Sequence, residues 1–556
     1  MVASSSSGIR LGLAVALAAA CGCVEFIAAP PAMSRPVMSA APDTRAHLSL
    51  FTRSDDCVAC HNQLVAPSGQ DVSIGAAWSA TMMANSGRDP YWQASVRREA
   101  LDHPRRSAEI QDECAGCHMP MSTRVTRAAG GTGAVFAHLP VAQPHPGALA
   151  RLGADGVSCT VCHQIAPVGL GTRPSFNAGF TMVPTRPGEP RPLFGPYTVD
   201  AGRRRIMHSV TGFVQTEGAH LRQSELCATC HTLITDAYGP DGSVVGSLPE
   251  QMNYQEWLHS DFPQESRSCQ SCHMVRVPGP VRVSSVLGDL RDGLSQHVFV
   301  GGNSFMLGLL DRHRGDLGVE APHEAFAVTM AATDRQLREQ TASVTISAPE
   351  RSPEGLVFDV DVKNLTGHKF PTGYPARRAW LHVTVRGAGG RVVFESGAIT
   401  PEGAIGGNDA DVDAGRYEAH HARISSPEDV QIYESVMGDS NGRPTTGLLT
   451  ATQYLKDNRL LPRGFDKSTA ETGVAVHGGA LADPDFVGGS DRVRFVVAAA
   501  QQDGPFSVSV ELRYQAVGFR WARNLESYPA PEPARFSTYY REAAPGSSVL
   551  VAHVER

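Results

Sequence analysis

The sequence predicts an α+β protein of several domains, with a loop-rich, mostly helical first half followed by an antiparallel β-sandwich. Its 556 residues are too many for one compact domain. Between residues 57 and 273 the chain repeats one Cys-x-x-Cys-His pentapeptide five times, among many Gly and Pro residues. After residue 342 the apolar residues alternate with polar ones, which is typical of half-buried antiparallel strands.

The five pentapeptides carry the chemistry of the first half. They use ten of the 12 cysteines, and they are Cys57-Val-Ala-Cys60-His61, Cys114-Ala-Gly-Cys117-His118, Cys159-Thr-Val-Cys162-His163, Cys227-Ala-Thr-Cys230-His231 and Cys269-Gln-Ser-Cys272-His273. This spacing indicates covalently attached c-type haem. The two thiols add to the haem vinyl groups, and the adjacent His binds the iron. We therefore expect five haems.

Other uses of a Cys-x-x-Cys pair fit less well. A zinc half-site or a thioredoxin-like redox pair does not require His after the second Cys, and here it follows in all five copies. Structural zinc would also need the motifs to pair, and five is an odd number. The mildly acidic formal charge of −7 does not indicate a nucleic-acid partner.

The N-terminus indicates export. Arg10 precedes the apolar run Leu11 to Ala20, which is too short to span a bilayer and suits a signal peptide over residues 1–23. Cys21 follows at once and is a candidate for lipidation, which would attach the chain to a membrane. The alternative is ordinary cleavage near Ala29 or Ala41. No later stretch approaches the ~20 apolar residues of a spanning helix, so we expect a periplasmic or outer-membrane-associated protein.

Composition and the spacing of apolar residues predict how the rest of the chain divides into segments. We expect a linker over residues 24–46, a pentahaem domain over 47–320, an Ala-rich connecting helix over 321–341 and a β-sandwich over 342–556. The alternation that predicts strands is clearest at residues 356–363, 381–385, 493–497 and 506–514.

A six-coordinate haem also needs a ligand on the side opposite the motif His, usually His or Met. Context favours His220, His297, His208 and His368 over the other histidines. His138, His145 and His259 are weaker candidates. Met83, with Met82 beside it, is a candidate for a Met-ligated haem, although Met on an apolar helix face is more often core filler.

One further metal site is conceivable. Asn408, Asp409, Asp411 and Asp413 alternate as calcium ligands do, but Ala414 and His420 occupy positions where an EF-hand loop has Gly and Glu. A solvated turn is the alternative reading of this loop.

The region 57–273 resembles the multihaem cytochrome c superfamily that includes the tetrahaem electron acceptor of hydroxylamine oxidoreductase. The shared phrases are Asp155-Gly-Val-Ser-Cys-Thr-Val-Cys-His163 and Ser224-Glu-Leu-Cys-Ala-Thr-Cys-His231. In that superfamily a Trp-x-x-Ser-x-His-Ala phrase often supplies a distal His. The matching stretch here is Trp78-Ser-Ala-Thr-Met-Met-Ala84, so Met83 stands in place of that His.

The second half resembles exported bacterial multihaem cytochromes with a fused sandwich, through Gly367-His-Lys-Phe-Pro-Thr-Gly373, Arg377-Arg-Ala-Trp-Leu-His382 and Gly406-Gly-Asn-Asp409. The resemblance implies an electron carrier between redox proteins. One alternative is an oxidoreductase with one open-coordinate haem that acts on a small inorganic nitrogen or sulfur species, with Arg88 and Tyr91 near it. Another is a sandwich that binds a surface partner while the haems only conduct electrons to it.

Overall fold

The structure is a computed structural model that describes residues 43–139, 146–186, 189–498 and 504–556. The expected signal peptide, the lipidation candidate Cys21 and most of the 24–46 linker lie outside these residues, as does His145. Within the described ranges, no helix is both long and apolar enough to cross a bilayer.

Short helices joined by long irregular segments make up the first part of the described chain. They are α1 (Asp55–Val58), α2 (Ile74–Ser79), α3 (Pro90–Asp102), α4 (Ser107–His118), α5 (Pro120–Ala128), α6 (Ala148–Ala154), α7 (Cys159–Cys162), α8 (Ala201–Thr211), α9 (Ser224–His231), α10 (Asn253–Leu258), α11 (Cys269–His273), α12 (Ser304–Arg312), α13 (Arg314–Leu317) and α14 (His323–Gln340). Three small two-stranded sheets lie between them, formed by β1 (Arg191–Gly195) with β2 (Phe213–Glu217), β3 (Thr232–Tyr238) with β4 (Val244–Met252), and β5 (Val281–Arg282) with β6 (Leu290–Arg291).

Local sequence explains where these helices begin and end. The Asp89 side chain accepts hydrogen bonds from Tyr91 N and Trp92 N, and Pro90 takes the first helical position of α3. Asp200 caps α8 in the same way, and Gly212 ends that helix with a φ of 76°, which glycine adopts without strain.

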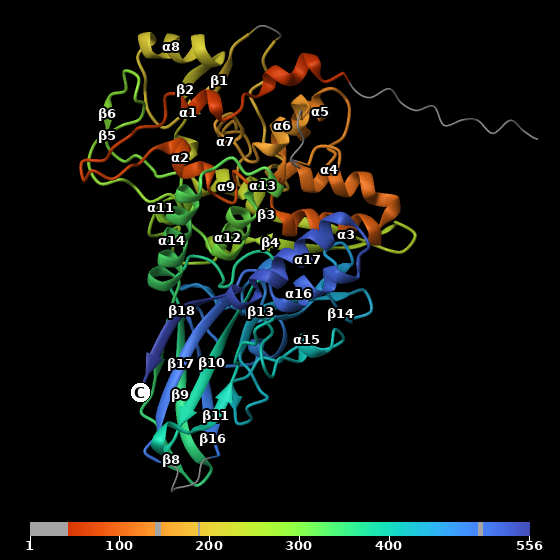
Figure 1. Cartoon of the computed structure of the whole chain (residues 1–556), viewed down its shortest axis with the longest axis vertical. Helices are drawn as coiled ribbons and strands as arrows, with labels where there is room; N and C mark the ends of the chain where they lie inside the picture. Colours follow the sequence, from red (N-terminus) through yellow and green to blue (C-terminus); the bar gives the residue numbers. More distant parts are fainter. Residues whose placement is uncertain (1–42, 140–145, 187–188, 499–503) are drawn as a thin grey trace, which may run out of the picture. The chain divides into compact units, whose positions relative to one another are not determined.

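The second part contains two larger sheets. In the first, the order is β14-β13-β10-β17-β18, with β11 beside β10 and β15 beside β13; in the second it is β12-β16-β9-β7, with β8 beside β9. The strands are β7 (Ala342–Ile346), β8 (Glu350–Ser352), β9 (Gly355–Asn364), β10 (Arg378–Arg386), β11 (Val392–Ser396), β12 (Arg423–Ile424), β13 (Ile432–Asp439), β14 (Pro444–Thr445), β15 (Ala451–Asp457), β16 (Ser490–Val497), β17 (Ser507–Gln515) and β18 (Ser548–Glu555). Figure 1 shows β9, β10, β16, β17 and β18 running alongside one another.

The alternation seen in the sequence coincides with β9, β10, β16 and β17. Their inward residues form one apolar core between the two sheets, in which the rings of Phe358 on β9 and Phe495 on β16 stack with centroids 5.3 Å apart. This packing of opposed sheet faces excludes water from both.

The C-terminal part also contains helices that alternation did not predict: α15 (Asp409–Val412), α16 (Phe519–Asn524) and α17 (Pro531–Ala543). Helix α17 packs on α3 of the first part, where Glu532 pairs with Arg97 at 2.8 Å and Phe536 contacts Tyr91. The two parts therefore share an apolar cluster.

Candidate functional site

Each pentapeptide lies on a short helix or at its end: in order, α1, α4, α7, α9 and α11. In a helix, residues at i, i+3 and i+4 project from the same side. The two Cys and the His of a motif have this spacing. Local helix formation alone therefore presents two thiols and one imidazole to the same space.

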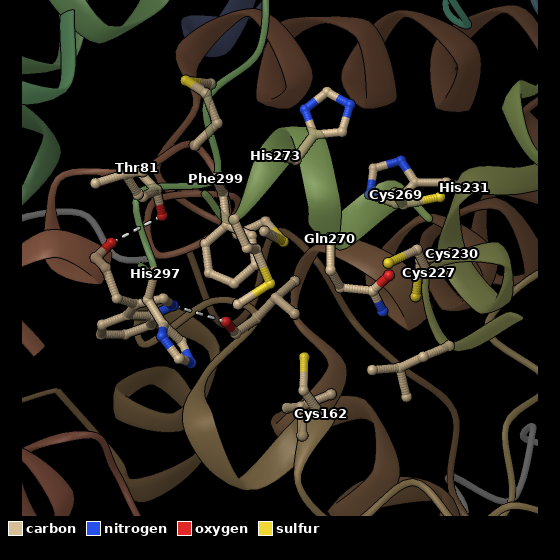
Figure 2. Close-up of a pocket in the computed structure, with 18 of the residues that line it drawn as sticks. Thr81, Cys162, Cys227, Cys230, His231, Cys269, Gln270, His273, His297 and Phe299 are labelled. Carbon is tan, nitrogen blue, oxygen red and sulfur yellow. Dashed lines mark hydrogen bonds between the residues drawn. The ribbon is translucent and has the colours of Figure 1, made fainter. Parts of the chain in front are cut away.

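All fifteen Cys and His side chains of the motifs line one continuous cavity of about 1100 Å³. Figure 2 shows Cys162, Cys227, Cys230 and Cys269 around a common space, with His273 and His297 at its edges. This cavity exceeds the roughly 300–1,000 Å³ of an ordinary ligand pocket.

Thiols of different motifs lie against one another. Cys57 lies beside Cys159, Cys117 beside Cys230, and Cys227 beside Cys269. Cys162 is also close enough to the two cysteines of the fourth motif to interact with them electrostatically. The fourth motif therefore adjoins the second, third and fifth motifs, and the third adjoins the first.

Four of the five motif imidazoles are held by the backbone. Their Nδ1 atoms donate to carbonyl oxygens: His61 to Val283 at 2.6 Å, His118 to Ser86 at 3.4 Å, His163 to Phe194 at 2.6 Å and His273 to Val300 at 2.5 Å. Metal-binding histidines commonly make this second bond, which fixes the tautomer. It leaves Nε2 as the unprotonated nitrogen.

Two further imidazoles enter the cavity opposite motif histidines. His297 faces His163 with ring centroids 6.4 Å apart and planes 16° from parallel, and His368 faces His273 at 6.2 Å and 12°. Their Nδ1 atoms donate to Ser295 O at 3.0 Å and Lys369 O at 2.9 Å. Burial lowers the pKa of His297 and His368 to about 4, so both rings are neutral at neutral pH.

These distances fit a shared metal ion. Metal–imidazole bonds of about 2 Å on each side, plus ~1 Å from nitrogen to ring centre, place two such centroids roughly 6 Å apart. Paired thiols, a fixed motif imidazole and a large common cavity also suit a covalently attached macrocycle. The residues therefore fit haem at the motifs.

Several expected ligands do not reach the cavity. His220 is buried under Phe194, and its Nε2 donates to Ile165 O at 2.8 Å. His208 is exposed, because the cavity-facing side of α8 consists of Arg203, Ile206, Met207 and Val210. Neither His138 nor His259 lines the cavity.

Four methionine side chains do line the cavity: Met82 and Met83 from the turn after α2, Met207 from α8, and Met274 directly after α11. Met82 also packs in the apolar cluster of Tyr91 and Phe326, as core filler would. Met207 comes from α8, which packs against α1 of the first motif. The sequence analysis chose His208 and not its neighbour Met207, although Ile206, Met207 and Val210 form an apolar side of α8 from which His208 is absent.

The contacts of the acidic loop at residues 408–413 do not favour a calcium site. Asp411 accepts from Arg378 Nη1 at 2.8 Å and from Ile405 N at 2.8 Å. Asp409 pairs with Arg416 at 2.6 Å, and Asn408 caps α15. Guanidinium and backbone N–H groups thus occupy the oxygens that a cation would need.

A polar wall completes the cavity near the second motif. The hydroxyls of Tyr91 and Tyr374 lie 3.3 Å apart, and burial raises the pKa of the nearby Glu250 to about 8. Trp92 stacks on His118 with centroids 4.5 Å apart. Arg88, expected near an open haem, instead donates to Gly318 O and does not line the cavity.

Comparison with known proteins does not assign the chain to a family. No family model matches the sequence, and no curated protein matches it. Among solved structures, the chain is similar to a penta-haem cytochrome c552 from Thermochromatium tepidum, with 16% sequence identity and a TM-score of 0.48 over 91% of this chain and 99% of that chain.

Proposed function

We propose that this chain is an exported pentahaem c-type cytochrome that carries electrons between redox proteins. The observation that carries the proposal is the opening of all five motifs into one cavity, with thiols of neighbouring motifs in contact. Each thiol adds its S–H across a haem vinyl group, which forms a C–S bond and needs no oxidant. Each bound haem iron would cycle between the ferrous and ferric states and so carry one electron.

The protein's part is to place and tune the five sites. We propose the motif histidines as proximal ligands, with His297 completing the third site and His368 the fifth. Contacts between motif thiols would bring neighbouring haem edges together in the order first, third, fourth, with the second and fifth both beside the fourth. Burial and axial-ligand type would then set the individual potentials.

The test is haem stoichiometry in protein co-expressed with a haem-attachment system and exported. We expect five covalent haems per chain by haemochrome absorbance and intact mass, and five electrons taken up in a reductive titration. Fewer haems, or zinc at the motifs, would contradict the proposal.

One observation favours the oxidoreductase alternative. Within the described part of the cavity, His61, His118 and His231 have no second imidazole facing them, and Tyr91, Tyr374 and Glu250 supply hydroxyl and carboxylic acid groups nearby. A buried acid with a pKa of about 8 is protonated at neutral pH and could donate a proton to a reduced substrate. Protein that is entirely low-spin when oxidised and binds no CO when reduced would exclude this alternative.

A further inference from the structure

The loop that carries His368 belongs to the second part of the chain, whereas the motif that it faces belongs to the first. It joins β9 to β10. Among the described residues, the His368 ring makes one hydrogen bond shorter than 3.5 Å, to the carbonyl of Lys369 at 2.9 Å. This local bond orients the ring within its loop but does not fix the loop against α11.

A buried ionic network ties that loop to α10, between the fourth and fifth motifs. Lys369 N donates to Glu256 Oε2 at 3.1 Å, and Lys369 Nζ donates to Asp457 Oδ2 at 2.8 Å. Arg459 joins the two acids: it donates twice to Asp457, at 2.9 and 2.8 Å, and its Nη1 pairs with Glu256 Oε1 at 2.9 Å. We call these four residues the latch.

The latch is fully enclosed and electrically balanced. The side chains of Lys369 and Glu256 are 0% exposed, that of Asp457 2% and that of Arg459 7%. Two cations face two anions, so loss of one member leaves an uncompensated buried charge. Replacing a buried ion pair with apolar residues of similar size often leaves the stability of a protein unchanged or raises it. Stability alone therefore does not explain why this site carries four charged side chains.

Two further contacts close the same junction. A Cβ at Gly367 would lie 2.7 Å from the Phe262 ring, so only glycine permits this approach. Asn253 Nδ2 donates to Thr372 Oγ1 at 2.9 Å. The loop therefore meets the first part on both sides of His368.

We propose that Glu256, Arg459, Asp457 and Lys369 are positioning residues that hold His368 as the sixth ligand of the haem iron at Cys269–His273. This inference rests on the proposed haem function. It makes the coordination of that haem dependent on docking of the β-sheet part onto the helical part.

The experiment uses the full haem-loaded protein, three variants at the junction and His368→Ala, which removes the proposed ligand itself. Glu256→Gln removes one charge of the latch without changing its size. The double variant Glu256→Met/Arg459→Met removes a charged pair and leaves no excess charge, which protects folding. Glu265→Gln is the matched control, because Glu265 pairs with Arg463 across the same two parts but is exposed.

The readouts are the ferric spin state and the CO bound after reduction. In both latch variants we expect a high-spin signal at one haem, up to one additional CO per chain, a rise in one midpoint potential, and return to low spin on adding imidazole. The control should match the parent protein.

The possible outcomes distinguish failure of the positioning role from failure of the proposed haem function. A peptide with Cys269 and Cys272 that carries no haem would contradict the proposed function. If His368→Ala creates the additional CO site and both latch variants do not, the positioning role is overturned. If His368→Ala leaves that haem low-spin, the ligand assignment, and the positioning role with it, is wrong.

Discussion

The imidazoles of His273 and His368 lie 6.2 Å apart, centroid to centroid, with their planes 12° from parallel. The two residues are far apart in sequence, one on α11 and the other between β9 and β10. Such a pair completes a six-coordinate iron without any rearrangement of the chain. With His368 as the proposed ligand, the β-sheet part would have a direct role at a haem.

Replacing His368 with alanine should open the fifth site. We expect one haem of five to become high-spin and one additional CO to bind per chain after reduction, because no other described imidazole faces His273. Absorbance and electron paramagnetic resonance measure both effects. His382→Ala is the control, since His382 lies on β10 and pairs with Glu395 and Glu511 outside the cavity.

The fourth motif should be the junction of the electron pathway. Replacing Cys227 and Cys230 with serine removes its haem, and we expect electron redistribution among the remaining four to slow by at least tenfold, because longer gaps then separate them. Photoreduction with transient absorbance measures this rate. Loss of the first motif through Cys57→Ser/Cys60→Ser is the comparison, since that motif adjoins only the third among the contacts described. Equal slowing in both variants would contradict a central fourth site.

Met207 should be the sixth ligand of the first haem. It lines the cavity from α8, which packs on α1. Met207→Leu should abolish a far-red sulfur-to-iron absorption band and lower one midpoint potential, because Met ligation raises haem potentials. Met83→Leu is the matched variant. If Met83→Leu removes the band and Met207→Leu does not, the ligand is the one indicated by the Trp78–Ala84 phrase.

Asp491 should make the unfolding free energy fall with rising pH. Burial raises its pKa from 3.8 to about 7, and its carboxylate accepts from Tyr433 and Gln431 beside Asp483. Because the folded state binds this proton more tightly than the unfolded state, the stabilisation is complete below pH 3.8 and is lost as pH rises to about 7. The loss is on the order of 4 kcal/mol.

Asp491→Asn should flatten this part of the pH profile and be the more stable protein above pH 7. Calorimetric unfolding at a series of pH values measures the difference. The exposed Asp485→Asn is the control. A profile of unchanged slope in Asp491→Asn would show that another group titrates.

Much of the fold followed from local pattern. Two-residue alternation identified β9, β10, β16 and β17, because one face of each strand packs in the core and the other does not. The Ala-rich stretch matched α14. Helix α17 was not predicted, since it is stabilised by packing against α3, which lies more than 400 residues away in sequence. Helix α16, which contacts α17, was not predicted either.

The sequence by itself determined five Cys-x-x-Cys-His motifs and the prediction of haem at each, because the spacing of two thiols and one imidazole on a single helical turn is a local property. It also ranked His297 and His368 as ligand candidates from their turns and apolar neighbours. Only the tertiary structure decided that these two face His163 and His273, that His220 and His208 do not reach the cavity, and that four buried charges join the His368 loop to α10. The reason is that a distal ligand is set by two segments meeting in space, and no periodicity along one segment encodes that meeting.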